Sequence, residues 1–223
     1  MSVGGLIVGA GESRRAGFDK VFASLAGLPV LAHSLRTFVE SPEIDRVVLV
    51  LSATNADQGR RLVAEGEWAK PVDVCLGGRR RQDSVAFGLA ELADCDWVVV
   101  HDAARPLVTP QLIARGLQAA AAGGAAIAAV PVTDTIKLVG PTRLVRATPP
   151  RADLWSVQTP QVFRYRLLVD AYAGAKDDFT DDAGLLEQLG QPVAVFEGSY
   201  DNIKITHAHD LTLAEALLTL RGG

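Results

Sequence analysis

The sequence predicts an α/β protein whose mostly parallel central β-sheet is covered by helices on both faces. Short runs of apolar residues alternate with segments in which apolar residues recur every three or four positions. The short runs are uniformly apolar, which is typical of strands that are buried on both sides. Alternation of such strands with helices favours parallel pairing through right-handed crossovers. The length of 223 residues suits one large domain of this kind.

The first part of the chain supplies most of this sheet. We expect buried strands at residues 3–8, 46–51, 72–76, 96–100 and 125–132. We expect amphipathic helices between them at 28–40, 81–92 and 109–120. The last of these helices has the clearest boundaries, because Thr109 can cap its N-terminus, Pro110 suits the first helical position and Gly123-Gly124 can end it.

The pattern changes after residue 132, where a hairpin-like excursion interrupts the alternation. Its two short strands, 135–139 and 143–148, flank Gly140-Pro141, and we expect residues 133–153 to form a projecting β-arm. The remaining elements are expected as a strand at 155–163, helices at 164–175 and 181–189, strands at 192–196 and 202–206, and a helix at 209–220. No linker or repeat divides the chain, so residues 1–223 are expected to form one domain.

Composition and charge exclude several classes of protein. The 22 basic and 26 acidic residues give a net charge of −4, which offers no basic surface for nucleic acid or an anionic membrane. The two cysteines lack CxxC spacing and fit a reduced compartment. The longest stretch with little charge, 119–132, is too short to span a bilayer. We therefore expect a soluble cytoplasmic protein that binds neither nucleic acid nor membranes.

A glycine loop, Gly9-Ala10-Gly11, directly follows the first predicted strand and is followed by Arg14, Arg15 and Lys20. A dinucleotide-binding loop would need a third glycine at position 14 and an acid after the second strand, and the sequence has neither. A Walker A loop is excluded because the sequence contains no Gly-Lys pair. A plain connecting turn stays open, but three cations crowded on one loop favour an anionic ligand such as a phosphate.

Five further motifs occur in a characteristic order. They are GG…DSV (77–85), HDAARP (101–106), PVTDTIK (131–137), QTPQ (158–161) and DNIKIT (201–206). Together with the glycine loop, Arg15 and Lys20, they resemble the 2-C-methyl-D-erythritol 4-phosphate cytidylyltransferases of the non-mevalonate isoprenoid pathway. The resemblance runs from about residue 3 to the last predicted helix and implies a single Rossmann-like nucleotidyltransferase domain. The chain departs from the family pattern at Gly9, Ser13, Ala16, Asp19 and Arg79, and the segment between Arg15 and Lys20 is shorter than usual.

The resemblance implies transfer of CMP from CTP to 2-C-methyl-D-erythritol 4-phosphate, with release of pyrophosphate. The attacking phosphate monoester has a second pKa of ~6, so near neutral pH it is already an anion and needs no general base. The barrier is then the approach of two polyanions, which amides, cations and Mg²⁺ can lower.

The resemblance also implies a role for each site residue. Arg15, Lys20 and Lys204 are expected to be catalytic. CTP is expected to contact Gly9, Ala10, Gly11, Gly78, Ser84 and Asp102. The polyol phosphate is expected to contact Arg105, Thr135, Arg151, Thr180 and Lys204. Asp102, at the carboxyl end of a predicted parallel strand, is the expected Mg²⁺ ligand. The family further implies a homodimer in which the β-arms embrace and Arg151 completes the neighbour's active site. Apolar residues on an isolated hairpin also favour a dimer, because the hairpin cannot bury them against itself.

Structural roles stay open for several of these residues. Asp102 can cap a turn, Arg105 can hold its loop through a carboxylate, Ser84 and Thr180 can cap helices, and Lys204 can extend into solvent. The cluster of His207, His209 and Asp210 is expected to bind no metal, and Arg79-Arg80-Arg81 is expected to form a local rim that attracts anions. Two other functions also stay open: a cytidylyltransferase for another polyol phosphate, such as ribitol 5-phosphate, and a non-catalytic nucleotide-binding module.

Overall fold

A computed structural model describes residues 1–11, 18–174 and 178–222. Its central sheet has seven strands in that part of the chain, in the order β11-β7-β10-β6-β1-β4-β5. Their bounds are β1 (Val3–Gly9), β4 (Arg46–Leu51), β5 (Val72–Leu76), β6 (Trp97–Asp102), β7 (Ala125–Pro131), β10 (Trp155–Arg164) and β11 (Ala194–Glu197). Strand β10 is antiparallel to β6 and β7, whereas the remaining pairs are parallel. The predicted mostly parallel sheet is confirmed.

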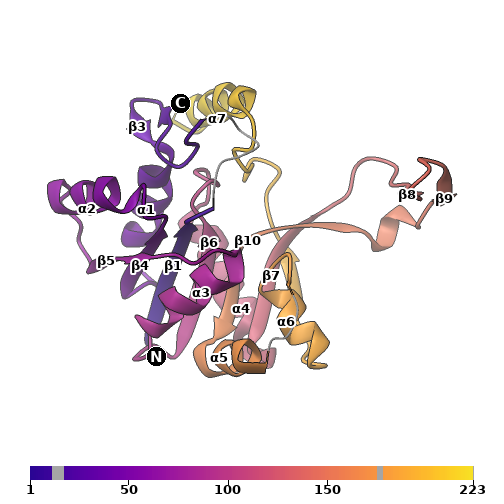
Figure 1. Cartoon of the computed structure of the whole chain (residues 1–223), viewed down its shortest axis with the longest axis horizontal. Helices are drawn as coiled ribbons and strands as arrows, with labels where there is room; N and C mark the ends of the chain where they lie inside the picture. The colour runs from indigo at the N-terminus through magenta and orange to yellow at the C-terminus, as the bar shows by residue number, and fades with distance from the viewer. Residues whose placement is uncertain (12–17, 175–177, 223) are drawn as a thin grey trace.

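Helices cover both faces of the sheet, and each face has its own apolar core (Figure 1). One layer comprises α1 (Val30–Glu40), α2 (Ala56–Glu65) and α4 (Pro110–Gly123), and the other α3 (Arg81–Ala90), α5 (Tyr165–Gly174) and α6 (Ala183–Gln188). A smaller cluster joins α7 (Ala208–Gly222) to the hairpin of β2 (Ser24–Leu25) and β3 (Leu28–Pro29). The alternation of strands and helices thus gives a three-layer α/β fold.

The predicted boundaries of α4 are confirmed. The Thr109 hydroxyl accepts a hydrogen bond from the Leu112 N–H at 3.3 Å. Pro110 is the first helical residue, and Gly124 ends the helix with φ of 85°. Glycine suits this position because a side chain there would strain the left-handed backbone.

Three parts of the chain differ from the prediction. Helix α2 was not expected, because it is largely polar and only Ala56 and Gly59 are buried along it. The short β2–β3 hairpin was also missed. The strand expected at 202–206 is wrong: the segment is irregular, and the Ile205 N–H bonds the loop carbonyl of Ala104 at 2.8 Å instead of a neighbouring strand.

The arm leaves the sheet between β7 and β10 and projects far from the body of the molecule (Figure 1). It carries β8 (Leu138–Val139), β9 (Val145–Ala147) and the short 3₁₀ helix η1 (Arg151–Asp153), and β8 pairs antiparallel with β9. Apolar side chains on it face solvent; Leu144 is 71% exposed and Val145 is 59% exposed. The expected excursion is therefore confirmed. No helix within the described ranges is long and apolar enough to span a bilayer.

Candidate functional site

The carboxyl ends of β1, β5 and β6 meet at one edge of the sheet, where open α/β sheets bind ligands. Gly9 ends β1, Gly77 follows β5 and Asp102 ends β6. The β1 and β5 loops pack closely, since a Cβ on Gly77 would lie 2.2 Å from the Cβ of Ala10. Only glycine allows this approach, so the two loops form one continuous wall of a pocket.

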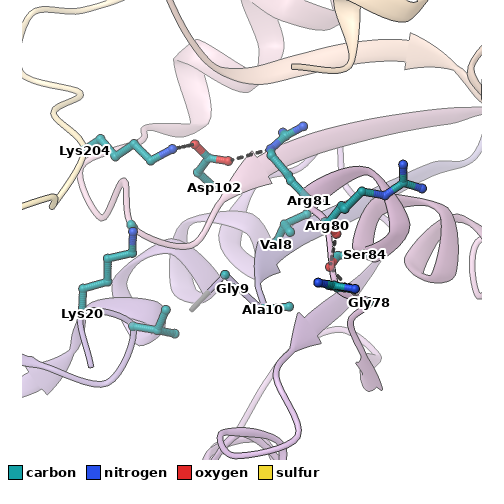
Figure 2. Close-up of a pocket in the computed structure, with 14 residues that line it drawn as sticks. Val8, Gly9, Ala10, Lys20, Gly78, Arg80, Arg81, Ser84, Asp102 and Lys204 are labelled. Carbon is teal, nitrogen blue, oxygen red and sulfur yellow. Dashed lines mark hydrogen bonds and ion pairs between the residues drawn. The ribbon is translucent and has the colours of Figure 1, made fainter. Parts of the chain in front are cut away.

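This first pocket brings together residues that lie far apart in the chain (Figure 2). Of the predicted site residues, its lining includes Gly9, Ala10, Gly11, Lys20, Gly78, Ser84, Asp102 and Lys204. All six residues predicted to contact CTP thus share one pocket with two of the three predicted catalytic residues. The third, Arg15, lies outside the described residues.

Ser84 organises the loop after β5. Its hydroxyl accepts the Gly78 N–H at 3.1 Å and donates to the Arg80 carbonyl at 3.1 Å. Ser84 is the fourth residue of α3, and the residue preceding that helix is Arg80, whose N–H bonds the Asp83 carboxylate at 3.1 Å. Ser84 therefore does not cap the helix, and its hydroxyl instead holds the loop that lines the pocket.

Asp102 lies at the centre of a group of cations (Figure 2). Its Oδ2 accepts a hydrogen bond from Lys204 Nζ at 2.6 Å, its Oδ1 lies 3.5 Å from Arg81 Nε, and Arg105 Nε lies 4.0 Å from Oδ2. Burial alone would raise the pKa of Asp102, but the charges of Lys204, Arg81 and Arg105 outweigh it and hold that pKa well below its usual range. Asp102 is thus an anion at neutral pH.

Arg81 is the functional residue that sequence reasoning placed least well. It was expected only as part of an exposed rim, yet it bridges Asp102 and the fully buried Asp182, whose Oδ2 lies 2.8 Å from Arg81 Nη2. Tyr172 donates its hydroxyl to the other oxygen of Asp182 at 2.5 Å. The only sequence signal for this role is the pair of acidic residues at 181–182, whose position across from α3 depends on the fold.

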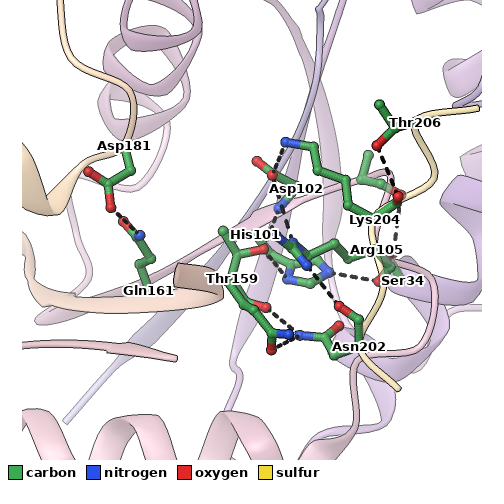
Figure 3. A network of polar contacts seen from close by, with 12 residues as sticks. Ser34, His101, Asp102, Arg105, Thr159, Gln161, Asp181, Asn202, Lys204 and Thr206 are labelled. Atoms are coloured by element: carbon green, nitrogen blue, oxygen red, sulfur yellow. Dashed lines mark hydrogen bonds and ion pairs between the residues drawn. The ribbon is translucent and has the colours of Figure 1, made fainter. Parts of the chain in front are cut away.

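His101 is buried behind Asp102 and links three segments (Figure 3). Its Nε2 lies 3.1 Å from the Arg105 carbonyl and must donate, so its Nδ1 accepts from the Thr159 hydroxyl at 3.0 Å. That hydroxyl in turn accepts the Asp102 N–H at 3.0 Å. Burial lowers the pKa of His101 to about 4. A neutral histidine thus holds the backbone that carries Asp102.

The irregular segment after β11 brings Lys204 to the site. The side-chain amide of Asn202 donates to the backbone carbonyl of Thr159 at 2.8 Å. The backbone carbonyl of Asn202 accepts a hydrogen bond from Arg105 Nη1 at 2.8 Å. These side-chain bonds replace the strand pairing that was expected. Arg105 thus supports the irregular segment through a backbone carbonyl, whereas the structural alternative expected it to hold its own loop through a carboxylate.

A second pocket adjoins the first, and the two share Arg81, Asp102 and Lys204. Arg105, Thr180 and Gln161 also line it. Thr180 is exposed and lies two residues before the N-cap of α6, so it does not cap that helix. Asp102 and its cations thus stand between two separate spaces, as a reaction that joins two ligands would require.

The remaining two predicted residues lie on the arm. Thr135 is exposed and lines neither pocket. Arg151 donates to the Thr133 carbonyl at 2.7 Å and lines a third hollow at the base of the arm, with Trp155 and Tyr200. Within one chain, the structure therefore does not bring Thr135 or Arg151 to the Asp102 site.

The described residues contain no metal site built from several protein ligands. Among the described residues, no group of three His, Cys, Asp or Glu side chains is arranged to hold an ion. Asp102 is the one carboxylate that lines both described pockets at their junction. Mg²⁺ commonly takes one or two carboxylates together with substrate phosphates, so a single ionised aspartate between two pockets fits the protein's share of that donor set.

Comparisons with known proteins agree with this geometry. The family model described as 2-C-methyl-D-erythritol 4-phosphate cytidylyltransferase matches residues 3–220. Proteins of that name from Dehalococcoides mccartyi and Pelotomaculum thermopropionicum are 52% and 46% identical, over 97% and 99% of this chain and 96% of each relative.

Solved structures show the same fold. The 4-diphosphocytidyl-2C-methyl-D-erythritol synthase from Anaerococcus prevotii superimposes with a TM-score of 0.87 at 28% identity, covering 98% of this chain and 96% of that one. The 2-C-methyl-D-erythritol 4-phosphate cytidylyltransferase from Thermus thermophilus gives a TM-score of 0.77 at 36% identity, covering 96% of this chain and 98% of that one.

Proposed function

The chain belongs to the family of 2-C-methyl-D-erythritol 4-phosphate cytidylyltransferases, and from this premise we propose how its two pockets divide the reaction. The enzyme transfers CMP from CTP to 2-C-methyl-D-erythritol 4-phosphate in isoprenoid precursor biosynthesis and releases pyrophosphate. We assign CTP to the first pocket and the polyol phosphate to the second. The observation that carries this assignment is that both pockets end at Asp102, Arg81 and Lys204.

The first pocket offers CTP two kinds of contact. Around the glycine loop, Gly9, Ala10 and Gly11 present backbone to phosphate oxygens with little steric hindrance. Next to the glycine loop in the same wall, Gly78 and Ser84 form the ordered turn that takes the nucleoside end. Arg79 lines the same pocket beside Gly78 and adds positive charge there.

The chemistry is electrostatic. The attacking phosphate is already an anion, so these residues need only hold two polyanions together and stabilise the charge that develops on the α-phosphate and the departing pyrophosphate. Lys20 and Lys204 line the first pocket from different parts of the chain and serve that purpose, with Arg15 as the further expected cation. Arg105 lines the second pocket and is placed to attract the phosphate of the polyol.

We propose that Asp102 holds Mg²⁺ when CTP is bound. Bound there, the ion neutralises phosphate charge. Lys204 and Arg81 already lie at the Asp102 carboxylate, so they are positioned to contact the same phosphates once the ion takes that carboxylate. Asp102 needs no further activation, because its depressed pKa keeps it ionised.

We also propose a homodimer that forms through the arms. The arm exposes Leu138, Leu144 and Val145, and a two-stranded hairpin cannot bury them against itself. In such a dimer, Thr135 and Arg151 serve the partner's second pocket, which accounts for their distance from the site of their own chain. We place the protein in the cytoplasm, which its two free cysteines support.

The test is pyrophosphate release from CTP and Mg²⁺ with three acceptors: 2-C-methyl-D-erythritol 4-phosphate, erythritol 4-phosphate and ribitol 5-phosphate. We expect turnover with the first acceptor at the highest kcat/KM. A higher kcat/KM with ribitol 5-phosphate would assign a different polyol. Tight CTP binding by calorimetry without turnover of any acceptor would make the protein a nucleotide-binding module.

A further inference from the structure

Gln161 is a fully buried amide in the wall of the second pocket, and only one of its two polar atoms has a hydrogen-bond partner among the described residues. Its Nε2 donates to Oδ2 of Asp181 at 2.8 Å (Figure 3). No group in the described parts of the chain donates to its Oε1, which is shielded from solvent. Because a carboxylate only accepts hydrogen bonds, Asp181 determines which way the amide is turned and leaves the oxygen unpaired. A buried carbonyl in this state favours a ligand that supplies a donor.

Ile127 lies next to this acceptor. In the antiparallel pairing of β10 with β7, Gln161 stands directly opposite Ile127. Directly opposed residues place their side chains on the same face of the sheet, with Cβ atoms about 4.5–5.5 Å apart. Both residues line the second pocket. The pocket wall therefore offers a hydrogen-bond acceptor and a branched apolar side chain side by side.

The charges of the pocket determine which part of a substrate reaches this wall. Lys204 and Arg105 lie near Asp102, where the phosphate of the polyol must come to meet CTP. Gln161 instead presents an oxygen and is bonded to the Asp181 carboxylate, and Figure 3 shows this pair apart from the Asp102 group. A phosphate would be repelled there, so the uncharged end of the substrate occupies it.

We propose that Gln161 and Ile127 together recognise the branched carbon of the substrate, C2. Gln161 Oε1 accepts a hydrogen bond from the C2 hydroxyl, and Ile127 contacts the C2 methyl group. This carbon is the one position in the molecule that carries a hydroxyl donor and a methyl group together, which matches the two neighbours in the wall. The inference rests on the proposed function, because it takes the second pocket as the polyol site.

The experiment compares kcat/KM for three acceptors: the natural substrate, its 2-deoxy analogue with hydrogen in place of the C2 hydroxyl, and erythritol 4-phosphate, which lacks only the methyl group. The wild-type enzyme is expected to disfavour the 2-deoxy analogue by about 10- to 100-fold, because that analogue leaves Gln161 unpaired. It is expected to disfavour erythritol 4-phosphate by about 10-fold or more, the usual effect of one missing methyl group in an apolar contact.

Two variants then separate the two contacts. Gln161→Met keeps the length of the side chain and removes the acceptor, so it should use the parent and the 2-deoxy analogue within about twofold of each other. Ile127→Val removes one methylene and should reduce the preference for the methyl group while the hydroxyl preference stays near wild type. A merely structural role would lower activity on all acceptors equally, and CTP affinity measured by calorimetry provides the control for folding.

The possible failures are distinguishable. Equal kcat/KM of the wild-type enzyme for the parent and the 2-deoxy analogue would overturn the inference without any variant, even if Gln161→Met did not fold. Undiminished hydroxyl discrimination by folded Gln161→Met would overturn it as well. Absence of wild-type turnover with 2-C-methyl-D-erythritol 4-phosphate would instead refute the proposed function.

Discussion

The ammonium group of Lys204 donates a hydrogen bond to Asp102 Oδ2 at 2.6 Å, joining residues that are 102 positions apart in the chain. Asp102 belongs to the central sheet, whereas Lys204 lies on an irregular segment held by Asn202. The pair stands where the two pockets meet. The enzyme therefore keeps a carboxylate and an ammonium group in contact before any phosphate arrives.

Lys20→Ala and Lys204→Ala should each lower kcat far more than they raise KM for the polyol. Both cations act on charge that develops in the transition state, and losing one such contact costs ~2.7–4 kcal/mol, or about 10²–10³ in rate. Steady-state kinetics at saturating CTP measures this. Lys70→Ala, which lies off the arm and outside both pockets, is the matched control and should keep its kcat. Near-wild-type turnover in either site variant would remove that lysine from the catalytic group.

Asp102→Asn should make activity depend on much higher concentrations of Mg²⁺. The amide keeps the shape of the side chain but loses the charge that holds the ion. A Mg²⁺ titration of activity at fixed CTP measures the shift, which should exceed about tenfold for the loss of a charged ligand. If the titration midpoint does not move, Asp102 supports the loop and does not bind the metal.

Arg81→Met should destabilise the protein, because it leaves Asp182 buried without its cation. Removing one partner of a buried pair costs ~3–5 kcal/mol. Replacing Asp182 by Asn in the same chain should recover most of that loss, since no charge then remains at position 182 to be left without a partner. Urea denaturation measures both variants. Arg79→Met is the matched exposed control, expected within about 0.5 kcal/mol of wild type. An unrecovered double variant would mean that packing, not charge, explains the loss.

Stability should fall as the pH is lowered from about 7 toward 4, because of His101. Its pKa is about 4 in the folded protein against an ordinary 6.5. Between these values the unfolded chain binds the proton and the folded chain does not, so acid favours unfolding. This lowered pKa contributes about 3 kcal/mol to stability, which is fully present above pH 6.5 and lost as the pH approaches 4.

Urea denaturation of wild type and His101→Asn between about pH 4.5 and 7.5 tests this dependence. The variant should be less stable at the upper end of that range but show a flatter profile, since it has no imidazole to titrate. Parallel profiles for the two proteins would show that His101 is not the group responsible.

Mixing two inactive variants should restore activity if the arms exchange. Lys20→Ala removes a cation from the first pocket of one chain, and Arg151→Ala removes the arm residue that the other chain supplies. Half of the re-equilibrated dimers contain one of each, and one of their two sites then carries both residues, so about a quarter of wild-type activity should return. Each variant incubated alone is the control. No recovery, or a monomer by light scattering, would refute the proposed dimer.

Much of the fold follows from local sequence. Uniform apolar runs such as VVLVL at 47–51 favour buried strands, and Thr109, Pro110 and Gly124 define both ends of α4 as expected. Such signals depend on residues that are neighbours in the chain, so they can be recognised from one sequence alone. Helix α2 was not predicted, because it is largely polar and buries only two residues.

Several residues that line the first pocket were also predicted from the sequence, because the motifs that carry them are contiguous. The resemblance placed Gly9, Ser84, Asp102 and Lys204 in one site, and the first pocket contains all four. The secondary structure of residues 202–206 could not be predicted from the sequence. Its apolar run suggested a strand, but hydrogen bonds with Thr159, Arg105 and Ala104 hold it in an irregular path.

By itself the sequence determined the class of fold and the family. Only the tertiary structure placed Arg81 between Asp102 and Asp182, and left Gln161 with an unpaired oxygen beside Ile127. The physical reason is that these relationships join residues distant in the chain, through the order of strands and the packing of α3 and α6 against α5. Local propensity does not encode such contacts, because the energy of a buried charge or an unpaired carbonyl depends on what surrounds it.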